Sequence, residues 1–139
     1  MSFEEKRTWV YLVSSAVSYS VYLVIVWGRA LHTPVAHVPY VSVLLWTTGA
    51  SIVASIVGNV AVEAARPSDS RQRDVRDRDI ARFGEHASRW FVVAGAVAAM
   101  CMAMARWDYF WIANVIYLGF TLWAVSGSVV RLVAYRRGL

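Results

Sequence analysis

Residues 9–27 read WVYLVSSAVSYSVYLVIVW, from Trp9 to Trp27, and these 19 residues contain no Asp, Glu, Lys, Arg or His. Crossing the roughly 30 Å hydrocarbon layer of a bilayer takes about 20 apolar residues in a helix. Because lipid offers the backbone no hydrogen-bonding partner, such a segment crosses a membrane as an α-helix. The stretch therefore predicts a transmembrane helix.

Three further apolar segments follow along the chain, at residues 41–62, 90–105 and 111–133. Across these three segments, the only Asp, Glu, Lys, Arg or His residue is Arg131, which lies near the end of the last one. Most tryptophans lie at segment boundaries, as is typical of an aromatic belt at the headgroup layer; these are Trp9, Trp27, Trp90, Trp107 and Trp111. The 139 residues predict one all-α domain, a polytopic membrane protein of four transmembrane helices.

Basic residues are strongly biased toward one side of this topology. Twelve of the 14 lie before the first span, in the connection 63–89 or near the C-terminus, and Arg29 and Arg106 lie on the other side. The positive-inside rule predicts cytoplasmic N and C termini and a multi-pass protein of the cytoplasmic (inner) membrane. Thirteen arginines against one lysine indicate a bacterial origin. No small-x-small cleavage site follows residue 27, so we expect the first helix to be retained.

Small residues recur at helical spacing in three of the predicted spans. In lipid, helices associate through close backbone approach and interhelical hydrogen bonds. We therefore predict helix-packing positions at small residues on one face of each helix, with a homodimer seam as the alternative. The positions are Ala50, Ala54, Gly58, Gly95, Ala99, Gly119 and Gly127.

Polar but uncharged side chains also occur within the predicted spans. They are Ser14, Ser15, Ser18, Tyr19, Thr47, Thr48, Asn59, Asn114, Tyr117 and Thr121. We interpret them as interhelical hydrogen-bonding groups, each contributing about 1 kcal/mol or less in a membrane. The alternative is that they line a polar path.

The residues that usually carry chemistry are sparse. The spans lack the carboxylate or histidine that proton-coupled transport needs, and they lack the facing histidines of a haem bundle. A single cysteine, Cys101, makes no disulfide or dithiol site. His32 and His37, with no third ligand nearby, are a weak metal motif. We expect no catalytic, cofactor-binding or metal-binding residues.

The connection 63–89 carries seven arginines and six acidic residues. The sequence places Arg73 with Asp77, Asp74 with Arg78, and Glu85 with Arg89 at helical spacing. An apolar face is also expected, made of Ile80, Phe83, Ala87 and Phe91. We therefore expect the third span to extend into the cytoplasm as an amphipathic helix. Its near-balanced charge disfavours nucleic acid as a partner.

The run Arg73-Asp74-Val75-Arg76-Asp77-Arg78-Asp79, followed by Gly84 and a short apolar hairpin, resembles a group of uncharacterised small bacterial integral membrane proteins. Those look like four-helix proteins with an Asp-Glu-Arg-Asp-type cytoplasmic motif before the third helix. Here Arg76 stands where Glu is expected. The similarity covers mainly residues 71–137, and it implies a topology but no reaction.

These observations lead to two functional hypotheses. The first is a non-enzymatic accessory or regulatory membrane protein that engages a cytoplasmic or membrane protein through the charged helix. The partner-binding residues are then Arg73, Asp74, Asp77, Arg78 and Arg82. The alternative is a homo-oligomeric channel or facilitator with a polar, uncharged path.

Overall fold

The computed structural model describes residues 3–65 and 75–137, and within them the chain is helical. The helices are α1 (Phe3–Ala30), α2 (Val41–Ala64), α3 (Val75–Met104) and α4 (Tyr109–Arg137), with a short 3-10 turn, η1, at Val35–His37. Each of the four α-helices is long and apolar enough to span a membrane. The prediction of an all-α chain with four helices of membrane-spanning length is therefore confirmed.

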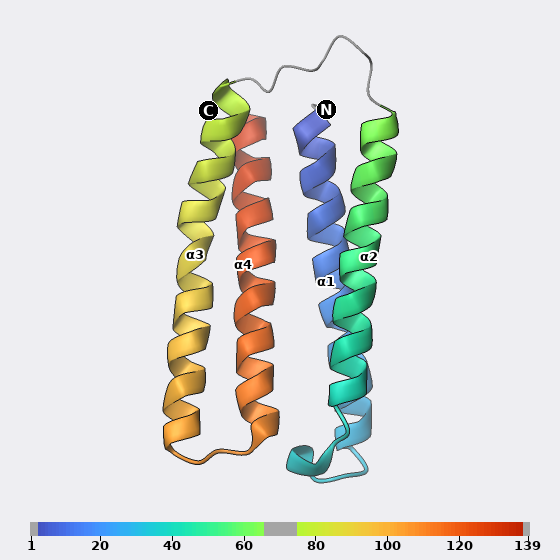
Figure 1. The fold of residues 1–139 in the computed structure, drawn as a ribbon, viewed down its shortest axis with the longest axis vertical. Helices are drawn as coiled ribbons and strands as arrows, with labels where there is room; N and C mark the ends of the chain where they lie inside the picture. The colour runs from blue at the N-terminus through green and yellow to red at the C-terminus, as the bar shows by residue number, and fades with distance from the viewer. Residues whose placement is uncertain (1–2, 66–74, 138–139) are drawn as a thin grey trace.

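The helices form two antiparallel hairpins that stand side by side (Figure 1). Helix α3 packs against α4, and α2 packs against α1. The hairpins meet mainly where α4 contacts α1 and η1. In Figure 1 the helices follow the order α3, α4, α1, α2, and the first residues of α1 and the last residues of α4 lie at one end of the bundle. We call this the terminal end, and we call the opposite end the hairpin end.

The predicted spans fall within these helices, except that Ala105 lies just past the end of α3. Helix α3 begins well before the predicted span at 90–105, because residues 75–89 are helical as well. At 1.5 Å per residue, its 30 residues extend about 45 Å. The third helix therefore continues beyond the length that a bilayer needs, as the charge and apolar spacing of residues 75–89 predicted.

The turn between α3 and α4 is tight and well capped. The amide of Arg106 donates to the carbonyl of Ala103 at 3.1 Å, and the amide of Trp107 donates to the carbonyl of Met102 at 3.0 Å. This pair of bonds is a Schellman cap, which requires a left-handed residue just past the helix. Arg106 adopts that conformation with φ of 58°.

Glycines bring α3 and α4 close together. A β-carbon on Gly127 would lie 2.9 Å from the hydroxyl oxygen of Ser88, and one on Gly84 would lie 3.0 Å from the carbonyl oxygen of Gly127. The buried face of the α3 extension is therefore Ile80, Gly84 and Ser88. Of the expected apolar face, Ile80 is buried, whereas Phe83, Ala87 and Phe91 are exposed.

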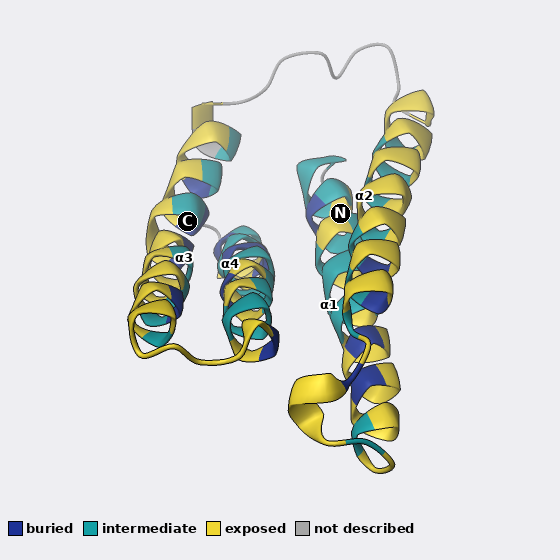
Figure 2. Cartoon of the chain, turned by 60° about the horizontal axis from the view of Figure 1, so that its bottom comes forward, coloured by how far each residue is buried: buried dark blue, intermediate teal, exposed yellow. Residues whose placement is uncertain are grey.

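A small apolar core lies at the hairpin end, where α1, α2, α4 and the residues around η1 meet. Its buried residues are Tyr22, Val26, Val38, Val43 and Phe110. The ring of Tyr40 packs edge-on against that of Phe110, with centroids 5.3 Å apart. Elsewhere the outward faces of α2 and α3 are largely exposed (Figure 2). An apolar outer surface of this kind suits a lipid surrounding.

Candidate functional site

The α3 extension, residues 75–89, presents a basic outer face. Arg78, Arg82, His86 and Arg89 are all exposed there. Their spacing of three or four residues places them along one side of the helix. The phenyl ring of Phe83 is 60% exposed beside them. A shallow hollow on this surface is lined by Arg82, Phe83, Glu85, His86, Arg89 and Arg131, among others.

Helix α4 packs against the extension next to this surface. The guanidinium of Arg131 lies 3.3 Å from the carboxylate of Glu85. Glu85 therefore pairs with a residue of α4, whereas the helical spacing had suggested Arg89 as its partner. Two residues before the end of α4, the phenol of Tyr135 donates a hydrogen bond to Asp77. The extension is thus fixed to α4 by polar contacts as well as by glycine packing.

These contacts divide the predicted partner-binding residues. Arg78 and Arg82 lie on the exposed face. Asp77 is half-buried and engaged with Tyr135. Arg73 and Asp74 lie outside the described residues, together with their expected pairs to Asp77 and Arg78. The structure therefore places two of the five residues on one accessible surface.

The predicted packing residues of the third and fourth spans lie at the α3–α4 interface. Gly95 and Gly119 face each other, Gly127 lies against Ser88, and Ala99 is 5% exposed. On α2, a β-carbon at Gly58 would lie 2.5 Å from the Val10 side chain of α1. Close packing of α2 on α1 therefore occurs at Gly58.

Ala50 and Ala54, predicted on the same stripe as Gly58, lie further along α2. Both are exposed, and both border a groove beside α1. Of these three predicted packing positions on α2, Gly58 therefore packs tightly on α1, whereas Ala50 and Ala54 border an open groove.

Polar side chains join α1 to α2. Ser14 and Ser55 are hydrogen-bonded at 2.7 Å, and Ser18 donates to the carbonyl of Thr47. At the terminal end, the Nε of Arg7 donates to the side-chain oxygen of Asn59 at 3.1 Å. Polar residues predicted within the first two spans, Ser14, Ser18 and Asn59, thus form hydrogen bonds between α1 and α2.

A tyrosine cluster joins α4 to the first hairpin. The hydroxyl of Tyr22, a fully buried residue, donates to the side-chain oxygen of Asn114 at 2.7 Å. The rings of Tyr19 and Tyr22 contact Tyr117 edge-on, with centroids 5.2 and 4.9 Å away. Sequence reasoning named Tyr19 but missed Tyr22. The signal was its position three residues after Tyr19, which places both rings on one helix face.

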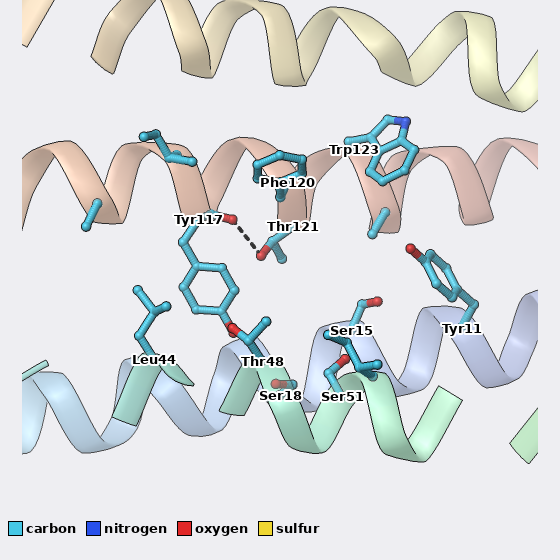
Figure 3. Close-up of a pocket in the computed structure, with 14 residues that line it drawn as sticks. Tyr11, Ser15, Ser18, Leu44, Thr48, Ser51, Tyr117, Phe120, Thr121 and Trp123 are labelled. Atoms are coloured by element: carbon cyan, nitrogen blue, oxygen red, sulfur yellow. Dashed lines mark hydrogen bonds between the residues drawn. The ribbon is translucent and has the colours of Figure 1, made fainter. Parts of the chain in front are cut away.

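A cavity of about 550 Å³ lies next to this cluster, between α1, α2 and α4. Four serine and threonine residues of α1 and α2 border it, namely Ser15, Ser18, Thr48 and Ser51. Figure 3 shows them across from Phe120 and Trp123, which come from α4. The hydroxyl oxygen of Thr48 is buried and has no hydrogen-bond partner. Thr121 also lines the cavity, but its hydroxyl donates to the carbonyl of Tyr117 on its own helix.

Groups that hold metals or perform thiol chemistry are not gathered in the described parts of the chain. Within residues 3–65 and 75–137, no three His, Cys, Asp or Glu side chains lie close enough together to bind a metal ion. The thiol of Cys101 is unpaired and exposed. The basic α3 surface and the hydroxyl-lined cavity are therefore the features that call for a functional explanation.

Comparison with protein-family models, with curated proteins and with solved structures gives no match for this chain. The similarity of residues 71–137 to small bacterial membrane proteins stays a prediction. The basic α3 surface and the hydroxyl-lined cavity are accordingly the basis for a functional proposal.

Proposed function

We propose that this chain is a multi-pass protein of a bacterial inner membrane, with both termini and the α2–α3 connection in the cytoplasm. Two observations support this orientation. The first residues of α1, the last residues of α4 and the helix ends that flank the connection lie at the terminal end of the bundle. Twelve of the 14 basic residues belong to that side, which the positive-inside rule assigns to the cytoplasm.

We propose further that the protein is a non-enzymatic accessory or regulatory subunit, and that its α3 extension is the docking surface. The observation that carries this proposal is the division of the extension into two faces. One face packs on α4 through Gly84 and Ser88, and Glu85 at its edge pairs with Arg131 of α4. The other presents Arg78, Arg82 and Arg89 to solvent. A surface held in place before binding loses little conformational entropy when a partner docks.

The charge and apolar content of this surface define the kind of partner. Three exposed arginines and His86 outnumber the exposed Asp79 and the half-exposed Glu85 on the described part of the extension. Arginine pairs with carboxylates in a bidentate manner and packs on aromatic rings. The exposed ring of Phe83 supplies an apolar anchor. An acidic, partly apolar segment of a cytoplasmic or membrane protein fits this surface.

The test is purification from the native membrane in mild detergent, followed by mass spectrometry of co-purifying proteins. We expect a stoichiometric partner that is lost in the double variant Arg78→Gln, Arg82→Gln. The matched control is Arg136→Gln, Arg137→Gln, which removes the same charge from exposed positions at the same end of the bundle. A partner retained by the first variant, or lost equally from both, would contradict docking at α3.

A homo-oligomeric channel or facilitator is the second candidate, and the cavity between α1, α2 and α4 favours it. Hydroxyl groups from three helices border that cavity, so a polar solute has partners there. Solute flux in reconstituted vesicles that survives Arg78→Gln, Arg82→Gln would favour this function over the accessory role.

A further inference from the structure

The cavity between α1, α2 and α4 has the size of a ligand site. Its volume is about 550 Å³, within the range of roughly 300–1,000 Å³ usual for small-molecule pockets. Its lining residues Ser18, Ser51 and Thr121 lie near the middle of the predicted spans, at about the depth of the bilayer centre. A ligand here would therefore reach the site from the membrane.

Three hydroxyl groups on one wall of the cavity have no hydrogen-bond partner within the described parts of the chain. The Thr48 oxygen is buried without a partner, and among the described residues the side chains of Ser15 and Ser51 show no hydrogen bond. Buried hydroxyls normally find a partner, since leaving one unpaired in an apolar setting is costly. Neighbouring hydroxyls follow this rule, as Ser18 donates to the carbonyl of Thr47. The three unpaired hydroxyls therefore point to a hydrogen-bonding partner from outside the chain.

The facing wall is aromatic. Phe120 and Trp123 of α4 lie across from the serine hydroxyls, and Tyr11 and Tyr117 lie near the two ends of the cavity (Figure 3). Aromatic side chains pack well against another planar ring, either offset or edge-to-face. No Asp, Glu, Lys, Arg or His lines this cavity. An ionised ligand would therefore lack a counter-charge, which is costly at this depth.

We infer that the cavity binds an uncharged, membrane-soluble molecule whose planar ring carries carbonyl or hydroxyl oxygens, the chemistry of a quinone headgroup. The hydroxyls of Thr48 and Ser51 donate to or accept from the ring oxygens. The ring itself packs against Phe120 and Trp123. This inference concerns binding alone, and it is independent of the proposed docking surface on α3.

The test uses the full chain in nanodiscs of uncharged phosphatidylcholine. A decyl-substituted benzoquinone is titrated by calorimetry, with empty nanodiscs as the blank. We expect saturable binding at one site per chain. Removing one hydroxyl by Thr48→Val or Ser51→Ala is expected to weaken it about three- to tenfold. Thr48→Ser keeps the hydroxyl and is expected to retain binding.

Ser20→Ala is the matched control, because that hydroxyl is exposed and bonds to Ala16 of its own helix. It is expected to bind like the unmodified protein. Uptake no greater than that of empty nanodiscs would overturn the inference, as would affinity that is the same in Thr48→Val, Ser51→Ala and Ser20→Ala. Equally tight binding of dioleoylglycerol, which has hydroxyl and ester oxygens but no ring, would overturn the assignment of a planar ligand.

Discussion

Gly95 of α3 lies directly against Gly119 of α4, so that a β-carbon on Gly95 would be 3.2 Å from the α-carbon of Gly119. Backbones approach this closely only where neither helix carries a side chain at the crossing. Van der Waals packing between small residues is a main source of helix association in lipid. This crossing therefore makes a large contribution to holding the second hairpin together.

The first prediction concerns this crossing. A β-carbon on Gly119 would lie 3.2 Å from the carbonyl oxygen of Phe91, where a backbone has little freedom to move away. We expect Gly119→Ala to lower the free energy of unfolding by about 1–3 kcal/mol. Unfolding in mixed micelles with increasing SDS measures this. Gly49→Ala is the control, because its β-carbon has no atom within 4 Å; an equal loss in both variants would contradict the prediction.

The second prediction concerns the link between the two hairpins. Tyr22→Phe removes the hydrogen bond to Asn114 while keeping the ring contact with Tyr117. We expect a loss of about 0.5–1 kcal/mol, the scale of a membrane hydrogen bond. The same SDS assay applies. Tyr109→Phe serves as the comparison, since Tyr109 is 85% exposed. Equal stability of Tyr22→Phe and the unmodified chain would show that this bond contributes nothing measurable.

The third prediction concerns the turn after α3. Arg106 occupies a left-handed conformation, with φ of 58°, which glycine adopts without steric cost. We expect Arg106→Gly to stabilise the fold by about 0.5–1 kcal/mol, and Arg106→Val to destabilise it, because a β-branched residue is strained there. Both variants remove the same charge, so the difference between their free energies of unfolding reflects the left-handed backbone conformation. A stability change of the same sign in both would mean that the charge, and not the backbone, decides.

The fourth prediction concerns orientation. In a Cys101→Ser background, single cysteines are introduced by His32→Cys at the hairpin end and by Arg78→Cys on the α3 extension. Both positions are exposed. In intact cells we expect a membrane-impermeant maleimide to label position 32 and not position 78, and permeabilised cells to show labelling at both. Labelling of position 78 in intact cells would reverse the proposed topology.

The sequence predicted the number, the type and the approximate extent of the helices, because unbroken apolar runs leave the backbone no alternative in lipid. It did not identify the buried face of the α3 extension. Apolar periodicity grouped Phe83 with Phe91, whereas small size decided the packing at Gly84 and Ser88. Within a membrane, a large apolar side chain is as well placed facing lipid as facing a helix, so periodicity alone does not identify the interface.

The two candidate sites differ in how far they were predictable. Exposed Arg78 and Arg82 follow from composition and helical spacing. The pairing of Glu85 with Arg131 joins residues 46 positions apart, so local spacing cannot predict it. The cavity depends on how three helices are spaced in the bundle. Its hydroxyl residues were recognised as polar positions, but which of them stay unpaired depends on the packing of α4 against the first hairpin.

The contact of α1 with α4 has a consequence for the synthesis of the protein. Helix α1 is synthesised well before α4, one of its main packing partners. Until α4 is made, the α1 face that carries Tyr19 and Tyr22 lacks its contacts with Asn114 and Tyr117. The second hairpin, in contrast, can assemble as soon as its own two helices are made. A chain truncated before Asn114 would thus leave the hydroxyl of Tyr22 without its acceptor, and an unpaired hydroxyl of this kind destabilises the fragment if it stays buried.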